Sequence, residues 1–373
     1  MIFHTTSKEP ILLLGNGVRS SGALEEVHEL FERTKIPILT TMNAVDLIPD
    51  DMKVGFIGTY GNRVSNHILS ECDLIISVGA RLGIRQVGNK RDYFGPKAKL
   101  IRADIDQYEL SRTVKVGEEK YLVDAKRFLR DLLDEDIPCY EDWNRRCFEA
   151  KKYLSNYDKY PGNLCIEEIS KYLPPDPIVA VDVGQNQCWV AQSMTIKGKQ
   201  GRMLIGGGFG SMGCGLPYAI GASIATKKTV YCITGDGGMQ MNIQELQTVY
   251  SEKLPIKILI INNSSLGKIS EVQRLDYGQR FMITNRESGY TTPDFVKVAN
   301  AYGIRAKTLE SYEKLDSVKD WLYDDEACVI NIMLPNDTLL LPKMNWNEKE
   351  MKPELDDAVI SKVLSILRGE DSA

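Results

Sequence analysis

An aspartate and an asparagine each stand directly after an apolar run in the second half of the chain. Asp236 lies in the segment GDGG after TVYCIT, and Asn263 ends the run IKILIINN. The residues between them, NIQELQTVYSEK, have helical spacing, and Asn242 with Glu245 resembles a capping box. In a strand–helix–strand unit both strands run parallel, so their carboxyl ends share one edge of the sheet. We therefore expect Asp236 and Asn263 to lie close together.

These two side chains have the chemistry of a partial metal site. Carboxylate and carboxamide oxygens are the hard ligands that Mg²⁺ or Ca²⁺ requires, and Mg²⁺ usually completes its shell with phosphate oxygens and water. The glycines of GDGG let the backbone approach a ligand closely, and the helix N-terminus offers N–H donors to a phosphate. The pattern predicts a metal that carries a phosphorylated ligand. The alternative is a pair of unrelated turns.

The first part of the chain has the rhythm of a doubly wound sheet. The 373 residues are enough for two domains with their own cores. Between residues 9 and 135, apolar runs such as PILLLGNG, CDLIISVGA and AKLIRADID alternate with helical patterns such as ALEEVHELFERT. This alternation is typical of parallel strands joined by helices.

The same rhythm returns later, in DPIVAVDVG, KTVYCITGDGG, IKILIINN and ACVINIMLP. We predict an α/β fold of two doubly wound domains with mainly parallel sheets, at residues 1–135 and 161–345. The charged and aromatic segment 136–160 is predicted to be a linker with one helix, and 346–373 a C-terminal tail.

Composition limits the partners. The net charge of −5 argues against nucleic acid or an anionic membrane as the main partner. No apolar run approaches the roughly 20 residues needed to span a bilayer. The eight cysteines are scattered without a CxxC pair, which is typical of buried thiols in a reducing cytosol. Histidines occur only at positions 4, 28 and 67, so the later part of the chain has no Ser-His-Asp triad.

GDGG followed by NN at this distance resembles the thiamine diphosphate (ThDP) motif of ThDP-dependent 2-oxo acid enzymes, above all the acetolactate synthase large subunits. DVGQNQCWVAQ resembles the segment of this family that contacts the diphosphate, and GGFGSMGCGLPYAIGA the segment that holds the aminopyrimidine ring. PILLLGNGVRSSGA and DLIISVGARLGIRQVG resemble the central domain. The resemblance extends from about residue 9 to 345, and its motifs are more specific for ThDP than for a substrate.

The resemblance implies roles for individual residues. Mg²⁺ would be bound by Asp236, by the side-chain oxygen of Asn263 and by the carbonyl of Ser265. The carbonyl of Gly210 would accept a hydrogen bond from the aminopyrimidine, and Met212 would force the two rings of ThDP into a V shape. The further cofactor contacts implied are Gly184, Gln185, Asn186, which stands where a histidine is common, Gly235, Gly237 and Gly238.

The central domain binds FAD in acetolactate synthases, whereas other ThDP enzymes have the same domain without FAD. The positions that match the FAD contacts are Gly15, Gly17, Arg81, Asp104 and Asp124. The segment ILLLGNGVRSS alone is a weak nucleotide fingerprint, because most such turns are tight strand–helix connections. Arg85 matches an arginine that reaches toward the active site, with a surface salt bridge as its alternative.

In this family a glutamate from an N-terminal pyrimidine-binding domain activates the cofactor, and no segment here resembles that domain. We therefore expect a 2-oxo acid enzyme without a catalytic acid of its own, inactive alone, in a homo- or hetero-oligomer with a second chain that supplies the domain. Lys268 and Val272 stand where the synthases carry a methionine and a tryptophan of the acceptor pocket, which leaves the substrates open. The alternatives are a non-catalytic or truncated remnant and a nicotinamide-dependent dehydrogenase.

Overall fold

The computed structural model describes residues 6–198, 200–345, 348 and 350–370, which form two compact units. The first unit consists of the described residues up to Lys159 and from Leu341 onward, and the second of Tyr160–Leu340. These limits differ from the predicted ones. The helix of the predicted linker, α7 (Glu141–Leu154), packs on the first unit, and so does α16 (Asp357–Arg368) from the predicted tail.

Burial explains why these two helices join the first unit. Trp143 of α7 is 2% exposed, and its indole N–H donates to the carbonyl of Pro10 at 3.0 Å. Val363 and Leu367 of α16 are fully buried in the same core. An amphipathic helix with such a face gains stability only when that face is covered. Charge and aromatic content alone did not distinguish this packed helix from a linker.

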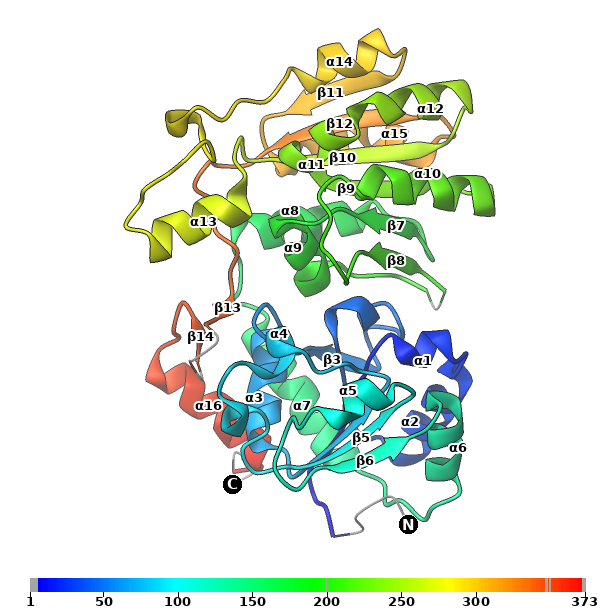
Figure 1. Cartoon of the computed structure of the whole chain (residues 1–373), viewed down its shortest axis with the longest axis vertical. Coiled ribbons are helices and arrows are strands. Elements are labelled where there is room, and N and C mark those ends of the chain that lie inside the picture. The colour runs from blue at the N-terminus through cyan, green and yellow to red at the C-terminus, as the bar shows by residue number, and fades with distance from the viewer. Residues whose placement is uncertain (1–5, 199, 346–347, 349, 371–373) are drawn as a thin grey trace. The chain divides into compact units, whose positions relative to one another are not determined.

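The first unit is built on a six-stranded, all-parallel sheet in the order β3-β2-β1-β4-β5-β6. Helices α2 and α6 pack together on one face, and α3, α7 and α16 cover the other (Figure 1). Strands β1 and β4 are buried along their whole length. The unit contains β1 (Pro10–Leu14), α1 (Gly17–Ser20), α2 (Leu24–Thr34), β2 (Ile38–Thr40), η1 (Met42–Ala44), β3 (Lys53–Phe56), α3 (Arg63–Glu71), β4 (Leu74–Val78), α4 (Ile84–Val87), η2 (Arg91–Tyr93), β5 (Lys99–Asp104), α5 (Gln107–Ser111), β6 (Glu119–Leu122), α6 (Ala125–Leu133), α7, the antiparallel pair β13 (Lys343–Met344) and β14 (Met351–Lys352), and α16.

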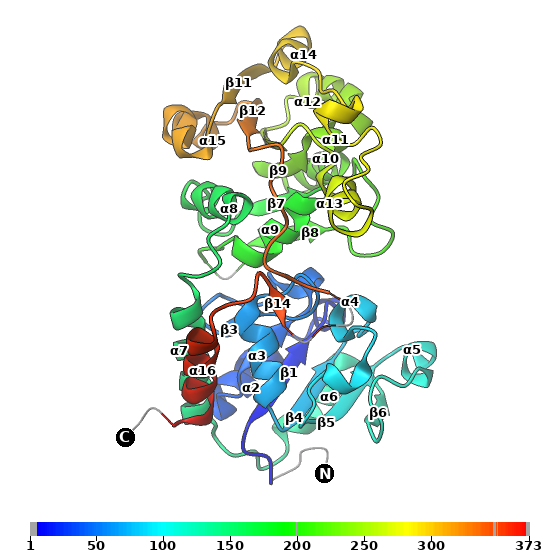
Figure 2. The same cartoon turned by 90° about the vertical axis from the view of Figure 1, so that its left-hand side faces the viewer.

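The second unit repeats the architecture with the strand order β11-β12-β10-β9-β7-β8, again all parallel. Helices α8 and α15 lie on one side of the sheet and α10 and α12 on the other (Figure 2). Its elements are α8 (Pro161–Lys171), β7 (Ile178–Val181), α9 (Gln185–Ser193), β8 (Arg202–Ile205), α10 (Gly215–Thr226), β9 (Val230–Gly235), α11 (Asp236–Met241), η3 (Ile243–Glu245), α12 (Leu246–Ser251), β10 (Ile256–Asn262), α13 (Gly267–Asp276), η4 (Arg286–Ser288), α14 (Phe295–Ala301), β11 (Arg305–Leu309), η5 (Tyr312–Val318), α15 (Lys319–Tyr323) and β12 (Cys328–Met333).

The prediction of two doubly wound α/β domains is confirmed by these sheets. The fully buried strands carried the signal, since long apolar runs are typical of central parallel strands. Strands β3, β6, β8 and β11 were not predicted. Each is only partly buried, so its sequence needs no long apolar run. Strand β6, for example, alternates between half-buried and exposed positions along the sequence EKYL.

The predicted capping box at Asn242 is wrong. Helix α11 begins at Asp236, directly after β9, and ends before Asn242, whose φ of −133° is not helical. The Asn242 side chain instead donates to the carbonyl of Gly213 at 2.8 Å, which joins this break to the glycine-rich loop between β8 and α10, residues 206–214. The predicted single helix is therefore divided into α11, η3 and α12. Within the described ranges, no helix is long and apolar enough to cross a membrane.

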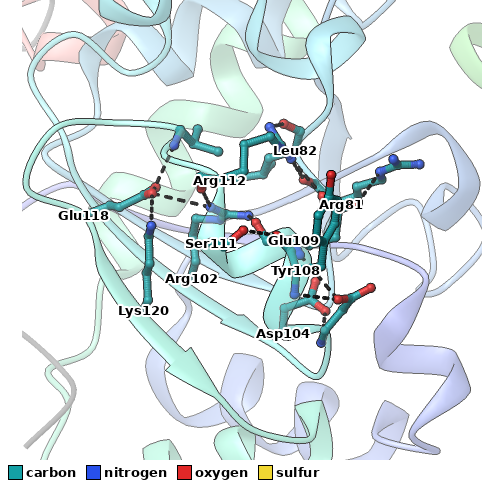
Figure 3. Close-up of polar contacts among 12 residues, drawn as sticks. Arg81, Leu82, Arg102, Asp104, Tyr108, Glu109, Ser111, Arg112, Glu118 and Lys120 are labelled. Atoms are coloured by element: carbon teal, nitrogen blue, oxygen red, sulfur yellow. Dashed lines mark hydrogen bonds and ion pairs between the residues drawn. The ribbon is translucent and has the colours of Figure 1, made fainter.

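A buried ion pair holds the irregular segment between β5 and β6. Arg102 of β5 is 1% exposed, and its guanidinium lies 3.4 Å from a carboxylate oxygen of Glu118 (Figure 3). The guanidinium also donates to the carbonyls of Arg112 and Glu109. The Glu118 carboxylate accepts in turn from the main-chain N–H of Val114 at 3.0 Å. One charged pair thus holds the part of this segment from residue 109 to residue 118.

We expect Glu118→Gln to lower the free energy of unfolding of the first unit by about 3 kcal/mol, because it leaves the buried Arg102 without its nearest carboxylate. Chemical denaturation would measure the difference. Glu149→Gln is the matched control, since the Glu149–Arg145 pair is 2.6 Å long but about half exposed and should contribute at most about 0.5 kcal/mol. Equal effects of the two substitutions would contradict a role for burial.

Candidate functional site

The predicted pair of polar residues meets at one edge of the second sheet. Strands β9 and β10 are parallel neighbours with Gly235 opposite Ile261, so Asp236 and Asn263 follow at the same edge. Strand β8 pairs with one edge of β7, and the next strand in the sequence, β9, pairs with the other edge. The direction of the strand order therefore switches between β7 and β9. Ligands of doubly wound sheets bind at such a switch, beyond the carboxyl ends of the strands.

A cavity of about 120 Å³ lies at this edge, beyond the carboxyl ends of the strands. Its walls come from the carboxyl ends of β7, β9 and β10 and from the starts of the helices that follow. Gly210 is not among the lining residues; it lies in the exposed part of the glycine-rich loop, with a φ of +65°. The predicted residues that line the cavity are Gly184, Gln185, Asn186, Met212, Gly235, Asp236, Gly237, Gly238, Asn263 and Ser265.

Asp236 is a buried carboxylate whose hydrogen-bond donors are neutral. It is 2% exposed, and its Oδ2 accepts from the main-chain N–H of Ser265 at 3.1 Å and from the hydroxyl of Tyr290 at 3.2 Å. Burial raises the pKa of Asp236 to about 7, although these hydrogen bonds oppose the shift. A buried carboxylate with only neutral donors gains stability from a cation. Its environment therefore fits a metal ligand.

Asn263 and its neighbours form the second wall of the cavity. The Asn263 side chain is 5% exposed and donates through Nδ2 to the Gln185 side-chain oxygen at 3.1 Å. Asn336 donates to the main-chain carbonyls of Asn263 and Ser264 at 2.8 and 2.9 Å, which fixes the turn after β10. The Ser265 hydroxyl donates to the carbonyl of Thr284 at 2.7 Å. This turn is thus held independently of any ligand.

Asp182, at the end of β7, organises the glycine-rich loop. Its Oδ1 accepts from the main-chain N–H groups of Val183 and Gly213 at 2.7 and 2.9 Å, and its Oδ2 accepts from the Thr234 hydroxyl at 2.9 Å. Burial raises the pKa of Asp182, although these hydrogen bonds favour its charged form. Asp182 was not among the predicted site residues. Its place directly after a predicted strand, as with Asp236, was the available signal.

The glycines around the cavity are required by close packing. A Cβ on Gly238 would lie 2.4 Å from Asp182 Oδ2, and one on Gly237 would lie 2.7 Å from Leu266. Gly184 has a φ of +135°, and a Cβ there would lie 2.7 Å from the Asn186 side-chain oxygen. Asn186 itself donates to the carbonyl of Asp182 at 2.8 Å, so its amide nitrogen is bound within the protein.

Two lining residues extend from the cavity toward solvent. Met212 is 42% exposed, and its sulfur lies 3.9 Å from the position that a Cβ on Gly237 would take. Lys268 lies on the first turn of α13 and lines the same cavity, whereas Val272 on the next turn is 42% exposed. Of the two residues that depart from the synthase pattern, the structure thus places Lys268 at the cavity.

The predicted FAD contacts of the first unit have partners within the protein. Arg81 forms an ion pair with Glu109 at 2.6 Å, and Asp104 accepts from the main-chain N–H of Asp106 at 3.0 Å (Figure 3). Asp124 caps α6 by accepting from the N–H groups of residues 126 and 127. Gly15 and Gly17 pack directly on the backbone of Gly79. Each residue thus has a contact within the protein, and its role in FAD binding stays a prediction.

Two residues of the site could not be predicted from local patterns. Tyr290 contacts Asp236 from the loop after η4, and Glu271 reaches Gln185 from α13. Neither has a local sequence signal, because their contacts depend on how distant segments fold together. In the part of the chain that the structure describes, no group of three or more His, Cys, Asp or Glu side chains could hold a metal. The candidate ligands here are instead one carboxylate, one carboxamide and one carbonyl.

Comparisons with known proteins agree with this geometry. Residues 5–132 match the family model of the thiamine pyrophosphate enzyme central domain, and residues 182–332 match that of the C-terminal TPP binding domain. Thiamine pyrophosphate and thiamine diphosphate are the same compound.

Three of the similar proteins are acetolactate synthase large subunits. The probable subunit of Methanocaldococcus jannaschii is 36% identical over 348 residues, which cover 88% of this chain and 58% of the relative. The subunit of Cyanidium caldarium is 37% identical over 334 residues, 83% of this chain and 55% of the relative. The isozyme 2 subunit of Escherichia coli is 31% identical over 335 residues, 86% of this chain and 59% of the relative. This chain thus matches somewhat more than half the length of these relatives.

Proposed function

The chain belongs to the thiamine pyrophosphate enzymes, with their central and C-terminal domains, and from this premise we propose that it binds ThDP with Mg²⁺ and takes part in the decarboxylation and carboligation of a 2-oxo acid. The observation that carries the proposal is Asp236, a buried carboxylate with neutral donors beside Asn263 at the switch in strand order. When bound, ThDP would supply the nucleophile for the 2-oxo acid and would accept the electron pair that departing CO₂ leaves behind. The protein supplies binding and orientation.

In the proposed complex, Asp236 and the side-chain oxygen of Asn263 bind Mg²⁺ together with the carbonyl of Ser265. This set provides hard oxygens and leaves the remaining positions to diphosphate oxygens and water. The proposal is supported by the contacts that already hold each ligand. Tyr290 and the Ser265 N–H fix one oxygen of Asp236, and Asn336 fixes the turn of Asn263.

The diphosphate is proposed to lie against the start of α9 and the glycines after β9. Gly184 is the N-cap of the nine-residue helix α9 and provides no side-chain cap, and Gln185 and Asn186 of the first turn line the cavity. The N–H groups at a helix N-terminus bind phosphate well. Gly235, Gly237 and Gly238 bring the backbone close to the same space. Met212, at the mouth of the cavity, would support the bend between the two rings, and the carbonyl of Gly210 the aminopyrimidine.

A pyrimidine-binding domain is proposed to cover the open side of this site, supplied by a second chain or another part of the protein. Residues 203–226 contain no charged residue. Phe209 in this stretch is fully exposed, and Met212, Tyr218 and Ile224 are each at least 40% exposed. Apolar surface of this kind marks an interface. The covering domain would bring the glutamate that activates the cofactor, which makes the active enzyme an oligomer or a larger protein.

Lys268 is proposed to select the acceptor, because this basic residue lines the cavity at the position where the synthases have a methionine. A more polar or anionic acceptor than pyruvate would suit it. FAD binding by the first unit, through Gly15, Gly17, Arg81, Asp104 and Asp124, stays a prediction that the proposed function does not require.

The proposal predicts Mg²⁺-dependent binding of ThDP to the purified chain, measured by isothermal titration calorimetry. Thiamine without phosphates should bind far more weakly, and excess EDTA should release ThDP, because the diphosphate is held through the metal. Failure of ThDP to bind in the presence of Mg²⁺ would contradict the proposal. Turnover of a panel of 2-oxo acids, with the partner present, would then separate an enzyme from a non-catalytic cofactor-binding subunit.

A further inference from the structure

A chain of three buried side chains leads from α13 to the candidate metal site. Glu271 Oε2 accepts from Gln185 Nε2 at 3.1 Å, and Gln185 Oε1 accepts from Asn263 Nδ2 at 3.1 Å. All three residues are 5% exposed, so bulk water does not compete for these hydrogen bonds. Sequence resemblance assigns Gln185 to the diphosphate, but in the structure both ends of its amide are bound within the protein.

The direction of this chain is fixed at its outer end. The Gln185 amide nitrogen lies 3.1 Å from the Glu271 carboxylate and 3.0 Å from the carbonyl of Thr338, and both are acceptors. The opposite orientation of the amide would place its oxygen against two other oxygens. The NH₂ group of Gln185 must therefore face Glu271, and its oxygen must face Asn263.

This direction determines the orientation of Asn263. Because Gln185 presents an oxygen, Asn263 must present its NH₂ group to it, which leaves the Asn263 oxygen for the cavity. Metal ions bind the oxygen of a carboxamide and not its protonated nitrogen. Glu271 is held in turn by the main-chain N–H of Leu340, which donates to the same oxygen at 2.8 Å.

Gly267 gives this chain its space. A Cβ at position 267 would lie 2.0 Å from Gln185 Oε1 and 2.8 Å from Asn263 Nδ2. Only glycine at the start of α13 lets the two amides meet there. The arrangement thus depends on Gln185 of α9, on Gly267 and Glu271 of α13, and on Asn263 in the turn after β10.

We propose that Glu271 is a positioning residue, which acts through Gln185 to turn the Asn263 amide oxygen toward the metal. This inference rests on the proposed binding of Mg²⁺ and ThDP. Partners of metal ligands in other sites contribute about 10–100-fold to metal affinity, which sets the expected size of the effect.

The test compares Glu271→Met, which removes the acceptor, with Glu271→Gln, whose amide oxygen can replace it. Mg²⁺ is titrated by calorimetry into each protein in the presence of the same excess of ThDP, and the thermal midpoint is measured without metal. We expect the Kd for Mg²⁺ to rise at least about 10-fold in Glu271→Met and less than about threefold in Glu271→Gln. The double variant Gln185→Met/Glu271→Met should bind Mg²⁺ no more weakly than Gln185→Met alone, because both residues act through one chain.

Three results would overturn the inference: unchanged Mg²⁺ affinity in folded Glu271→Met, equal losses in Glu271→Met and Glu271→Gln, or additive losses in the double variant. If Glu271→Met does not fold, the Mg²⁺ affinity of Gln185→Met is measured in its place, and the same loss is expected. If neither folds, the chain serves folding, and the inference is equally contradicted. A wild type that binds no Mg²⁺ and ThDP would instead contradict the proposed function itself, which separates the two failures.

Discussion

Asp236→Asn is expected to abolish Mg²⁺-dependent ThDP binding while making the metal-free protein more stable. Loss of a partner of a metal ligand costs about 10–100-fold in affinity, and loss of the anionic ligand itself should cost more. The fold, however, loses a buried carboxylate whose hydrogen-bond donors are neutral, so the free energy of unfolding rises. Calorimetric titration measures the first effect, and chemical denaturation in EDTA the second.

The gain in stability should depend on pH in a defined direction. Burial raises the pKa of Asp236 to about 7, so its ionised form destabilises the folded state above that pH. As the pH falls from 7 toward the ordinary carboxyl range, Asp236 takes up a proton, and the destabilisation by its buried charge disappears. Asp236→Asn should therefore be most stabilising near pH 8 and nearly neutral near pH 4.

Asp337→Asn is the matched control, because Asp337 is exposed within the same unit. It should leave both ThDP binding and stability within error of the wild type. An Asp236→Asn variant that still binds Mg²⁺ and ThDP tightly would remove Asp236 from the metal site. A variant that is less stable at every pH would show that the carboxylate serves the fold.

The sequence could predict Asp236 and Asn263 as neighbours because the argument needs only two parallel strands and their ends. The apolar runs of β9 and β10 are long and fully buried, so both strands were evident. Tyr290 could not be found in this way. It reaches Asp236 from a loop whose course is set by tertiary contacts and not by a local pattern.

The wrong capping box at Asn242 has a related cause. Local spacing favoured a helix start there, but the chain already turns into α11 at Asp236 because two glycines allow close packing against Asp182 and Leu266. The domain limits were similarly obscured by local composition. Helix α7 is polar on average and α16 is distant from the first unit in sequence, so only their packing shows that they belong to it.

Gly15→Ala is expected to destabilise the first unit by on the order of 4 kcal/mol or to prevent its folding. A Cβ at position 15 would lie 2.0 Å from the carbonyl oxygen of Gly79 and 2.4 Å from the Cα of Ala80. Both are backbone atoms at the end of β4, the central neighbour of β1, so neither can move without disturbing the sheet. Chemical denaturation of the variant, with and without added FAD, would measure the loss.

Gly22→Ala separates this collision from the general cost of replacing a glycine. Gly22 has a φ of +67° with no heavy atom within 4 Å of its added Cβ, so the substitution should cost only the 1–2 kcal/mol or so of a left-handed residue. If Gly15→Ala causes a large loss of stability that FAD does not change, the G-x-G pattern is explained by packing between the turns that follow β1 and β4. A Gly15→Ala variant that folds normally but loses FAD would instead assign these glycines to a flavin site and contradict the packing explanation.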